Sequence, residues 1–336
     1  MPNRLSMIRW NSREGSTREL TSARQTTIGH AVHCSGIGLH SGCSVEMKLL
    51  PAPAGQGIVF RRVDLPDSAR IAGSDQIAAR FDPIVDTRLG MTLGNKDGVR
   101  VATVEHLLAA LMGCGIDNVE VELTGPEVPV MDGSAAPFVF LIECAGLRQF
   151  NVRRRALRIL QPVMVEDGDK RAELLPAPRF TVDVEIDFAA TAVRRQRFII
   201  DVTEAEFRTH VSRARTFGFL SEVESLRANG LALGGSLENA VVVDGDIVLN
   251  ADGLRFSDEF VRHKALDAIG DLALAGAPIL GRFRGVRSGH TLNAALLRAL
   301  FASDDAFEFV TLNDPERMAP EEALTAGGAI GISARA

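Results

Sequence analysis

The chain has 336 residues and a mass of 36.1 kDa, a length that predicts about two domains of about 100–200 residues each. With 46% hydrophobic and 24% charged residues, the chain as a whole has the composition of a globular protein, well away from that of intrinsically disordered or low-complexity chains. The net charge of −6 and the pI of about 5.7 argue against a nucleic-acid partner, because general nucleic-acid binders carry a basic domain or stripe.

No sequence feature indicates a membrane or secreted protein. No apolar run approaches the roughly 20 residues that span a bilayer, and the first 24 residues lack the apolar core of a secretory signal. The four cysteines show no C-x-x-C spacing, so they predict free thiols rather than a disulfide framework or a Cys-type zinc site. We therefore expect a cytoplasmic protein without a transmembrane segment, and we expect it to be a monomer.

The N-terminal 150 residues predict an extension followed by a first domain. Residues 1–23 are polar and rich in Ser, Thr and Arg, and we expect them to be a disordered extension. Thr103 is the expected N-cap of a helix that two glycines close. The patterns of the first α+β domain, residues 24–150, predict strands at 45–49 and 119–123 and helices at 104–111 and 137–145.

A polar, basic stretch at 150–155 precedes a second α+β domain, residues 151–303. Its patterns predict strands at 158–165, 180–187 and 196–200 and helices at 204–213, 259–274 and 291–302. Strands and helices mix without regular βαβ alternation, which favours an α+β fold over a doubly wound parallel sheet. Residues 304–336 are rich in Ala, Glu, Gly and Pro and are expected to form a C-terminal tail.

One predicted helix, 259–274, carries ionisable side chains at helical spacing. His263, Asp267 and Asp271 are four residues apart, so they share one helix face. A histidine and a carboxylate at this spacing offer a metal ion one nitrogen and one oxygen. The alternative is a His–Asp contact on a solvated face.

Glu105 and His106 adjoin near the start of the predicted helix 104–111. Neighbouring helical side chains point about 100° apart, so both can approach one centre from adjacent angles. This pairing suits a metal-binding histidine beside a carboxylate that takes a proton from the metal's water. The alternative is a first-turn glutamate that favours the helix dipole and a histidine that only packs.

His290 follows a Ser-Gly pair where another helix is predicted to begin. An imidazolium there could hold a developing oxyanion and later protonate a leaving amine, and a plain helix start is the alternative.

Taken together, these residues suggest an amide or ester hydrolase. His106, His263 and Asp267 make three ligands with a fourth position open, which is the arrangement of catalytic zinc sites. Glu105 and His290 remain as acid–base partners. Spacing alone does not place His106 beside His263.

Several blocks of sequence occur in a fixed order between residues 24 and 303: 36–42 (GIGLHSG), 103–107 (TVEHL), 129–138 (PVMDGSAAPF), 212–219 (SRARTFGF), 234–240 (GGSLENA), the His263 helix and 288–290 (SGH). Through them the chain resembles the zinc-dependent UDP-3-O-acyl-N-acetylglucosamine deacetylases, the family that catalyses the committed step of lipid A synthesis. The resemblance implies two α+β domains of related topology, each a β-sheet packed against helices, with the active site between them.

The resemblance also implies a cofactor and catalytic roles. The cofactor is Zn²⁺, with His106, His263 and Asp267 as its ligands. The implied catalytic residues are Glu105 as general base, His290 as cationic acid, Asp271 as the carboxylate that orients His290, and Thr216 as a contact of the tetrahedral oxyanion.

The implied substrate is UDP-3-O-acyl-N-acetylglucosamine, whose acetamide is hydrolysed with release of acetate. Lys264 and Lys170 are the implied contacts of the diphosphate, and Asp187 and Phe188 those of the uracil end. Phe217 begins an apolar stretch that would form a slot for the acyl chain, with ordinary core packing as the alternative; the stretch continues through Phe219, Leu220 and Val223.

One departure from the family and two other function classes complete these expectations. Gly90 stands where the family often has a cysteine close to the metal, so zinc inhibition and pocket shape could differ. A non-catalytic, metal-containing protein that binds or senses a nucleotide sugar would need neither Glu105 nor His290. A fusion-type dehydratase acting on acyl carrier protein substrates is disfavoured, because we expect no second catalytic domain after Ser303.

Overall fold

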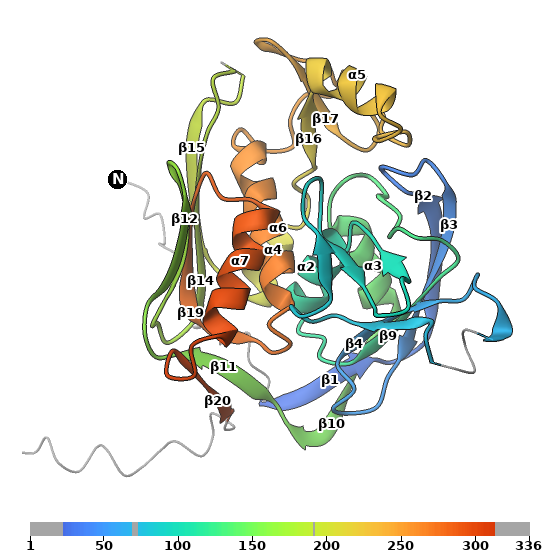
Figure 1. The fold of residues 1–336 in the computed structure, drawn as a ribbon, viewed down its shortest axis with the longest axis vertical. Coiled ribbons are helices and arrows are strands. Elements are labelled where there is room, and N and C mark those ends of the chain that lie inside the picture. Colours follow the sequence, from blue (N-terminus) through green and yellow to red (C-terminus); the bar gives the residue numbers. More distant parts are fainter. Residues whose placement is uncertain (1–22, 69–72, 191, 313–336) are drawn as a thin grey trace, which may run out of the picture.

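The structure is a computed structural model that describes residues 23–68, 73–190 and 192–312 (Figure 1). The expected N-terminal extension lies outside the described residues except for Ala23, and the expected C-terminal tail lies outside them from residue 313 on. Within the described ranges, no helix is long and apolar enough to cross a membrane.

A five-stranded sheet forms the outer layer of the N-terminal half. Its strands are ordered β2 (Val32–Ile37), β3 (Ser44–Pro51), β9 (Val119–Leu123), β4 (Ile58–Arg62) and β5 (Gln76–Ala78). Neighbours are antiparallel except β4 and β9, which are parallel. Buried residues alternate with less buried ones along β3 and β9, as in a sheet with one face on the core, and the predicted strands at 45–49 and 119–123 are confirmed.

The seven-stranded sheet of the C-terminal half repeats this plan. Five of its strands have the order β12 (Val163–Asp167), β13 (Lys170–Leu175), β19 (Ile279–Val286), β14 (Phe180–Asp187) and β15 (Arg195–Asp201). Again all neighbours are antiparallel except the central pair, β19 and β14. The predicted strands at 180–187 and 196–200 are confirmed, and so are the α+β class and the related topology of the halves.

The predicted strand at 158–165 is wrong, because two strands occupy this stretch. β11 (Arg155–Ile159) ends and β12 begins on either side of Pro162, which has no N–H to donate to a ladder. β11 pairs in parallel with β19 and antiparallel with β20 (Phe307–Thr311), a strand that the sequence patterns did not predict.

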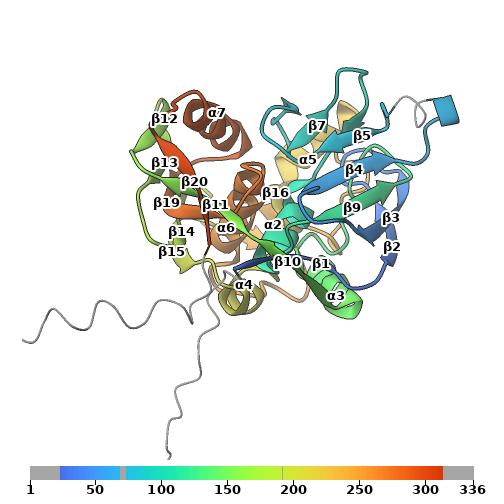
Figure 2. The ribbon, with the colours of Figure 1, turned by 90° about the horizontal axis from the view of Figure 1, so that it is seen from below.

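The main helices lie between the two sheets (Figures 1 and 2). In the first half, α2 (Glu105–Gly113) precedes the central strand β9 and α3 (Ala136–Ala145) follows it. In the second half, α6 (Glu259–Ala273) and α7 (His290–Phe301) flank β19 in the same way. The helices predicted at 137–145, 259–274 and 291–302 are confirmed to within one residue at each end.

Two predicted helix ends are wrong. Thr103 is not the N-cap of α2: its φ of 56° places it in the left-handed region, and Val104 caps the helix without a side-chain hydrogen bond. Near 204–213, α4 (Glu204–His210) ends three residues early, because Val211, with φ −123°, leaves the helical region.

Each half carries an insertion before its first main helix. The insertion lies between β5 and α2 in the first half and between β15 and α6 in the second. In the first half this is the sheet of β6 (Ile84–Asp86), β7 (Thr92–Gly94) and β8 (Arg100–Val101). In the second half the insertion consists of α4 followed by β16 (Phe217–Phe219), α5 (Leu220–Ala228), β17 (Val241–Asp244) and β18 (Ile247–Val248). The ribbon of β1 (Arg24–Ile28) and β10 (Leu147–Arg153) includes part of the polar stretch that was expected to separate the domains.

Candidate active site

Helices α2 and α6 meet where the two halves join. A Cβ atom at Gly270 would lie 2.0 Å from the carbonyl oxygen of Glu105, so this residue of α6 must lack a side chain for the helices to approach so closely. The crossing brings the first turn of α2, which holds Glu105 and His106, against the middle of α6, which holds His263 and Asp267.

His106, His263 and Asp267 form a buried cluster at this crossing. One nitrogen or oxygen atom of each lies within 4.8 Å of the others, and each residue is at most 4% exposed. The Nε2 atoms of His106 and His263 lie 3.6 and 3.2 Å from Asp267 Oδ1. The structure therefore brings together the three residues that the sequence singled out as metal ligands.

The ring of His263 is held in one tautomer. Its Nδ1 lies 3.0 Å from the carbonyl oxygen of Ala214, which only accepts, so Nδ1 carries the hydrogen and the lone pair is on Nε2. Burial lowers the pKa of His263 and outweighs the opposing effect of Asp267, which favours a neutral ring. Such a backbone partner is typical of a metal-binding histidine.

The carboxylate of Asp267 divides its two oxygens between different neighbours. Lys264 Nζ donates to Oδ2 at 2.7 Å, while Oδ1 has no hydrogen-bond partner within the described residues. Burial works against the charged carboxylate, but His263 and Lys264 outweigh it and hold the pKa of Asp267 well below its usual range. Two imidazoles and an unpartnered buried carboxylate oxygen are a donor set that Zn²⁺ takes, so these residues fit that ion.

Glu105 lies on one side of the cluster. Its Oε2 accepts a hydrogen bond from the backbone N–H of Met91 at 3.0 Å, and its Oε1 lies 3.9 Å from His290 Nε2. Burial raises the pKa of Glu105 more than His290 and His106 lower it, which makes the carboxylate a better proton acceptor. A Cβ at Gly90 would lie 2.6 Å from Oε1, so the absence of a side chain at this position leaves space beside the carboxylate.

His290 opens α7, and hydrogen bonds on the Nδ1 side of its ring hold the ring beside Glu105. Its Nδ1 lies 2.9 Å from Asp271 Oδ2, and Asn293 Nδ2 donates to the same carboxylate oxygen at 2.8 Å. Burial opposes the charged imidazole, but the negative charge of Asp271 outweighs it and raises the pKa of His290 to about 10. His290 is therefore an imidazolium near neutral pH, with Nε2–H directed to the side of Glu105.

Thr216 precedes Phe217, whose ring connects an aromatic cluster to His263. The Thr216 backbone N–H donates to the carbonyl oxygen of Gly133 at 2.8 Å, a bond between the two halves. The ring centroids of Phe217 and His263 are 6.4 Å apart, and Phe188 contacts Phe217 edge-on at 5.8 Å. These rings belong to an aromatic cluster that also includes Phe219 and Phe260.

The two lysines expected at the diphosphate lie in different places. Lys264 contacts Asp267 and lies 5.5 Å from the centre of the Phe217 ring. Lys170 is exposed at the start of β13, beside a cavity of about 290 Å³ that Arg171 and Arg284 also line.

Asp187, expected near the uracil end, is joined to the Lys170 turn through one arginine. Arg287 pairs with Asp187 at 2.6 Å and also with Asp169, which precedes Lys170 in the chain. The turn between β12 and β13, the last residue of β14 and the residue that follows β19 thus meet at one end of the second sheet.

Comparison with known proteins decides the family. Residues 25–302 match the family LpxC, UDP-3-O-acyl N-acetylglycosamine deacetylase. The chain belongs to this family. Three relatives bear the name UDP-3-O-acyl-N-acetylglucosamine deacetylase. That of Marinobacter nauticus is 51% identical and that of Idiomarina loihiensis 50%, each over 299 residues, 88% of this chain and 96% of the relative. That of Shewanella loihica is 48% identical over 308 residues, 91% of this chain and 99% of the relative.

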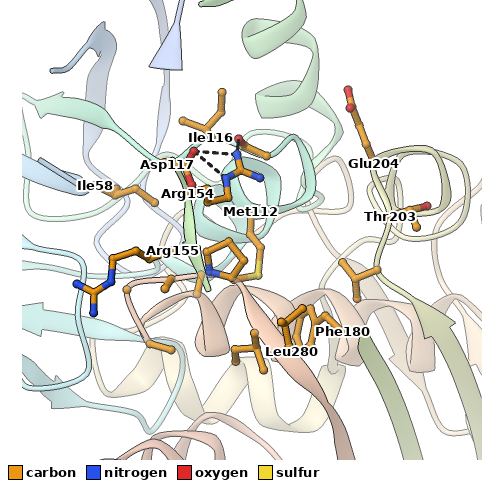
Figure 3. A pocket seen from close by; sticks show the side chains of 18 of the residues that line it. Ile58, Met112, Ile116, Asp117, Arg154, Arg155, Phe180, Thr203, Glu204 and Leu280 are labelled. Carbon is orange, nitrogen blue, oxygen red and sulfur yellow. Dashed lines mark hydrogen bonds and ion pairs between the residues drawn. The ribbon is translucent and has the colours of Figure 1, made fainter. Parts of the chain in front are cut away.

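The described part of the chain also contains a cavity of about 1840 Å³, some of whose lining residues are drawn in Figure 3. Met112, Phe180 and Leu280 line it, and the Asp117–Arg154 ion pair stands in its wall, at 2.8 Å. None of the candidate metal or catalytic residues lines it, so cavity volume does not indicate where the candidate site lies.

Sequence reasoning missed two groups that orient the candidate residues. Asn293 follows His290 by one helical turn, a spacing that could have drawn attention to it. The Ala214 carbonyl oxygen, which fixes the ring of His263, carries no signal in the sequence because it is a backbone atom.

Proposed function

We propose that the chain is a zinc-dependent deacetylase that hydrolyses the acetamide of UDP-3-O-acyl-N-acetylglucosamine, releasing acetate and UDP-3-O-acyl-glucosamine, the committed step of lipid A synthesis. Family membership and the names of the relatives support the substrate. The observation that carries the proposal is the buried His106–His263–Asp267 cluster, beside which the Glu105 carboxylate and the His290 imidazolium lie 3.9 Å apart.

His106, His263 and Asp267 would hold the zinc ion. When bound, zinc acts as a Lewis acid that polarises a water molecule and the substrate's carbonyl group. Glu105 takes a proton from the attacking water, a role supported by its raised pKa and its fixed bond to Met91. Water adds to the acetyl carbon to form a tetrahedral oxyanion, and the carbon–nitrogen bond then breaks.

His290 donates the proton that the leaving amine needs. Its Nδ1–H is held by Asp271, so Nε2–H is the proton free to move. The positive ring also stabilises the negative charge that develops on the acetyl oxygen, and Thr216 is the proposed neutral contact of that oxygen. One proton passes from water to Glu105 and one passes from His290 to the leaving nitrogen, so the proton transfers of the hydrolysis balance.

The substrate contacts follow the same reasoning. Lys264 and Lys170 supply positive charge for the diphosphate, and Asp187 is proposed for the uracil end. Phe188 and Phe217 belong to one aromatic cluster beside His263, so a substrate that crosses it would bring its acetamide toward the metal residues.

Two further parts of the proposal concern the whole molecule. In this proposal the protein is a monomer divided into domains near residue 150. The free cysteines Cys34, Cys43, Cys114 and Cys144 support the cytoplasm, a reducing compartment.

The test combines metal analysis with an acetate-release assay on UDP-3-O-acyl-N-acetylglucosamine. We expect about one zinc per chain, release of acetate, and loss of both in His106→Ala, His263→Ala and Asp267→Ala. Full zinc retention in all three variants would overturn the ligand assignment. A zinc-loaded protein that binds the nucleotide sugar and releases no acetate would instead favour the non-catalytic sensing protein.

A further inference from the structure

Glu127 is a buried carboxylate in the segment between β9 and α3, only 2% exposed, and the mechanism above does not use it. We propose that Glu127 is a positioning residue for the reaction: its carboxylate joins two loops and thereby fixes the backbone turn from which Glu105 and His106 emerge. The inference rests on the proposed function, because it assigns a role in that same site.

The first loop that Glu127 holds is 38–42. Glu127 Oε1 accepts the backbone N–H of His40 at 2.9 Å, and Oε2 accepts that of Ser41 at 2.9 Å. A Cβ at Gly38 would lie 2.4 Å from Oε2, so the loop closes around the carboxylate only because this residue is glycine. The bonding pattern requires an acceptor at both oxygen positions.

The second loop is the one that enters α2. The Thr103 hydroxyl donates to Glu127 Oε1 at 2.8 Å, and the neighbouring backbone is tied by the bond from Val128 N–H to the Ala102 carbonyl oxygen at 3.0 Å. Thr103 has φ 56°, a left-handed conformation that a β-branched residue adopts only when its surroundings impose it. The bond to Glu127 is such a constraint.

The turn at Thr103 sets the direction of the helix that carries the site. Val104 comes next, its N–H bonded to the Met91 carbonyl oxygen at 3.3 Å, and Glu105 begins the helix. If Thr103 relaxes to a negative φ, the chain no longer enters α2 at the same angle. Glu105 and His106 then shift relative to His263 and Asp267 on the other helix.

The loop at 38–42 reaches the site from a second side. His40 Nε2 lies 3.3 Å from the carbonyl oxygen of Leu89, next to the glycine that faces the Glu105 carboxylate. The same loop is bonded to the second half, where Gly234 N–H donates to the Leu39 carbonyl oxygen at 3.0 Å. The Glu127 carboxylate thus holds two segments that lie beside Glu105: the turn at Thr103 and the 38–42 loop, which contacts Leu89.

Different variants test the contact of Glu127 with the 38–42 loop and its contact with Thr103. Glu127→Gln places an amide N–H₂ where one carboxylate oxygen accepted, so in either orientation the 38–42 loop loses the acceptor of one backbone N–H, that of His40 or that of Ser41. Thr103→Val keeps the shape of the side chain but removes its hydroxyl, and Thr103→Ser keeps the hydroxyl. Thr103→Gly adopts a positive φ without strain. Asp183→Asn, at a buried carboxylate bonded to Arg197 and Arg282, is the control for loss of a buried charge.

Three measurements on the full chain separate positioning from folding: kcat and KM for acetate release, zinc retained against a chelator, and amide hydrogen exchange of the 38–42 loop. We expect Glu127→Gln and Thr103→Val to lower kcat by about 10- to 100-fold, as for other residues that orient metal ligands, and to lose zinc faster. Thr103→Ser and Thr103→Gly should stay near wild type. Exchange at His40 or at Ser41 should rise in Glu127→Gln, and exchange at both should stay unchanged in Asp183→Asn.

Wild-type kcat and zinc retention in a folded Thr103→Val protein would overturn the inference, as would equal losses in Thr103→Val and Thr103→Gly. Slow exchange at His40 and Ser41 in Glu127→Gln would overturn the loop contact. If the wild-type chain releases no acetate, the proposed function fails, and zinc retention and exchange still decide the role of Glu127.

Discussion

His290 Nδ1 lies 2.9 Å from Asp271 Oδ2, although the two residues belong to different helices, α7 and α6. Asp271 is fully buried, so its negative charge acts on the ring with little screening by water. The pair therefore holds a positive imidazole beside the candidate metal residues, and the pKa of His290 is raised to about 10.

The first prediction concerns the basic limb of the pH–rate profile. The imidazolium is the active form, so activity should persist below the pKa of His290 and fall as the pH rises through it, near 10 in the wild type. Asp271→Asn removes the charge that favours the imidazolium while burial remains, so the limb should move to lower pH. His290→Ala should lose the limb altogether. A limb that stays in place in both variants would show that another group supplies the proton.

The second prediction is that Asn293 contributes to the stability of the protein but not to the proton transfer. Asn293→Ala removes a hydrogen bond to a charged, buried group, which typically contributes about 1.5–3 kcal/mol, and the free energy of unfolding should fall by about that amount. The basic limb should remain, because Asp271 and His290 are both still present. Denaturant unfolding and the pH–rate profile measure the two effects.

Asn118→Ala is the matched control for Asn293, because Asn118 is also buried and hydrogen-bonded but lies in the first half near β4. It should be destabilised and keep its kcat. An Asn293→Ala protein without a basic limb would mean that Asn293 does more than hold Asp271.

The third prediction tests the general base. Glu105→Gln keeps the volume of the side chain and an oxygen that can accept the Met91 N–H, but it cannot take a proton. We expect zinc content and substrate binding to persist and kcat to fall by about 10²–10⁴-fold, the usual contribution of a general base. Stopped assays with metal analysis of the same preparation check this. A near-normal kcat would assign the base to another residue.

Short-range periodicity was enough to predict part of the site. The spacing of His263, Asp267 and Asp271 fixes one helix face whatever surrounds it, and α6 does present the first two to one cluster and the third to His290. Strands with simple alternation, such as β9 and β14, were predicted for the same reason.

Contacts across the chain could not be predicted in this way. His106 meets His263 only because α2 and α6 cross at Gly270, and no local pattern encodes that crossing. Thr103 resembled an N-cap because its hydroxyl suits one, but a carboxylate 24 residues away takes the hydroxyl instead. β20 alternates in sequence, yet its surroundings, rich in Ala, Gly and Pro, concealed a strand that only its pairing with β11 reveals.

The last prediction concerns Gly270. In an exposed helix interior, Gly→Ala stabilises by about 1 kcal/mol, because alanine loses less backbone entropy. Here the added Cβ would lie 2.0 Å from the Glu105 carbonyl oxygen, a backbone atom that cannot rotate away. Gly270→Ala should therefore lower the free energy of unfolding, typically by about 1–3 kcal/mol for an overpacked core. It should also push α2 from α6, so the separated His106 and His263 should retain zinc poorly against a chelator, and kcat should fall with the metal. Denaturant unfolding and metal analysis of Gly270→Ala check both effects, and a protein as stable and as zinc-loaded as the wild type would show that the helices can separate without disturbing the site.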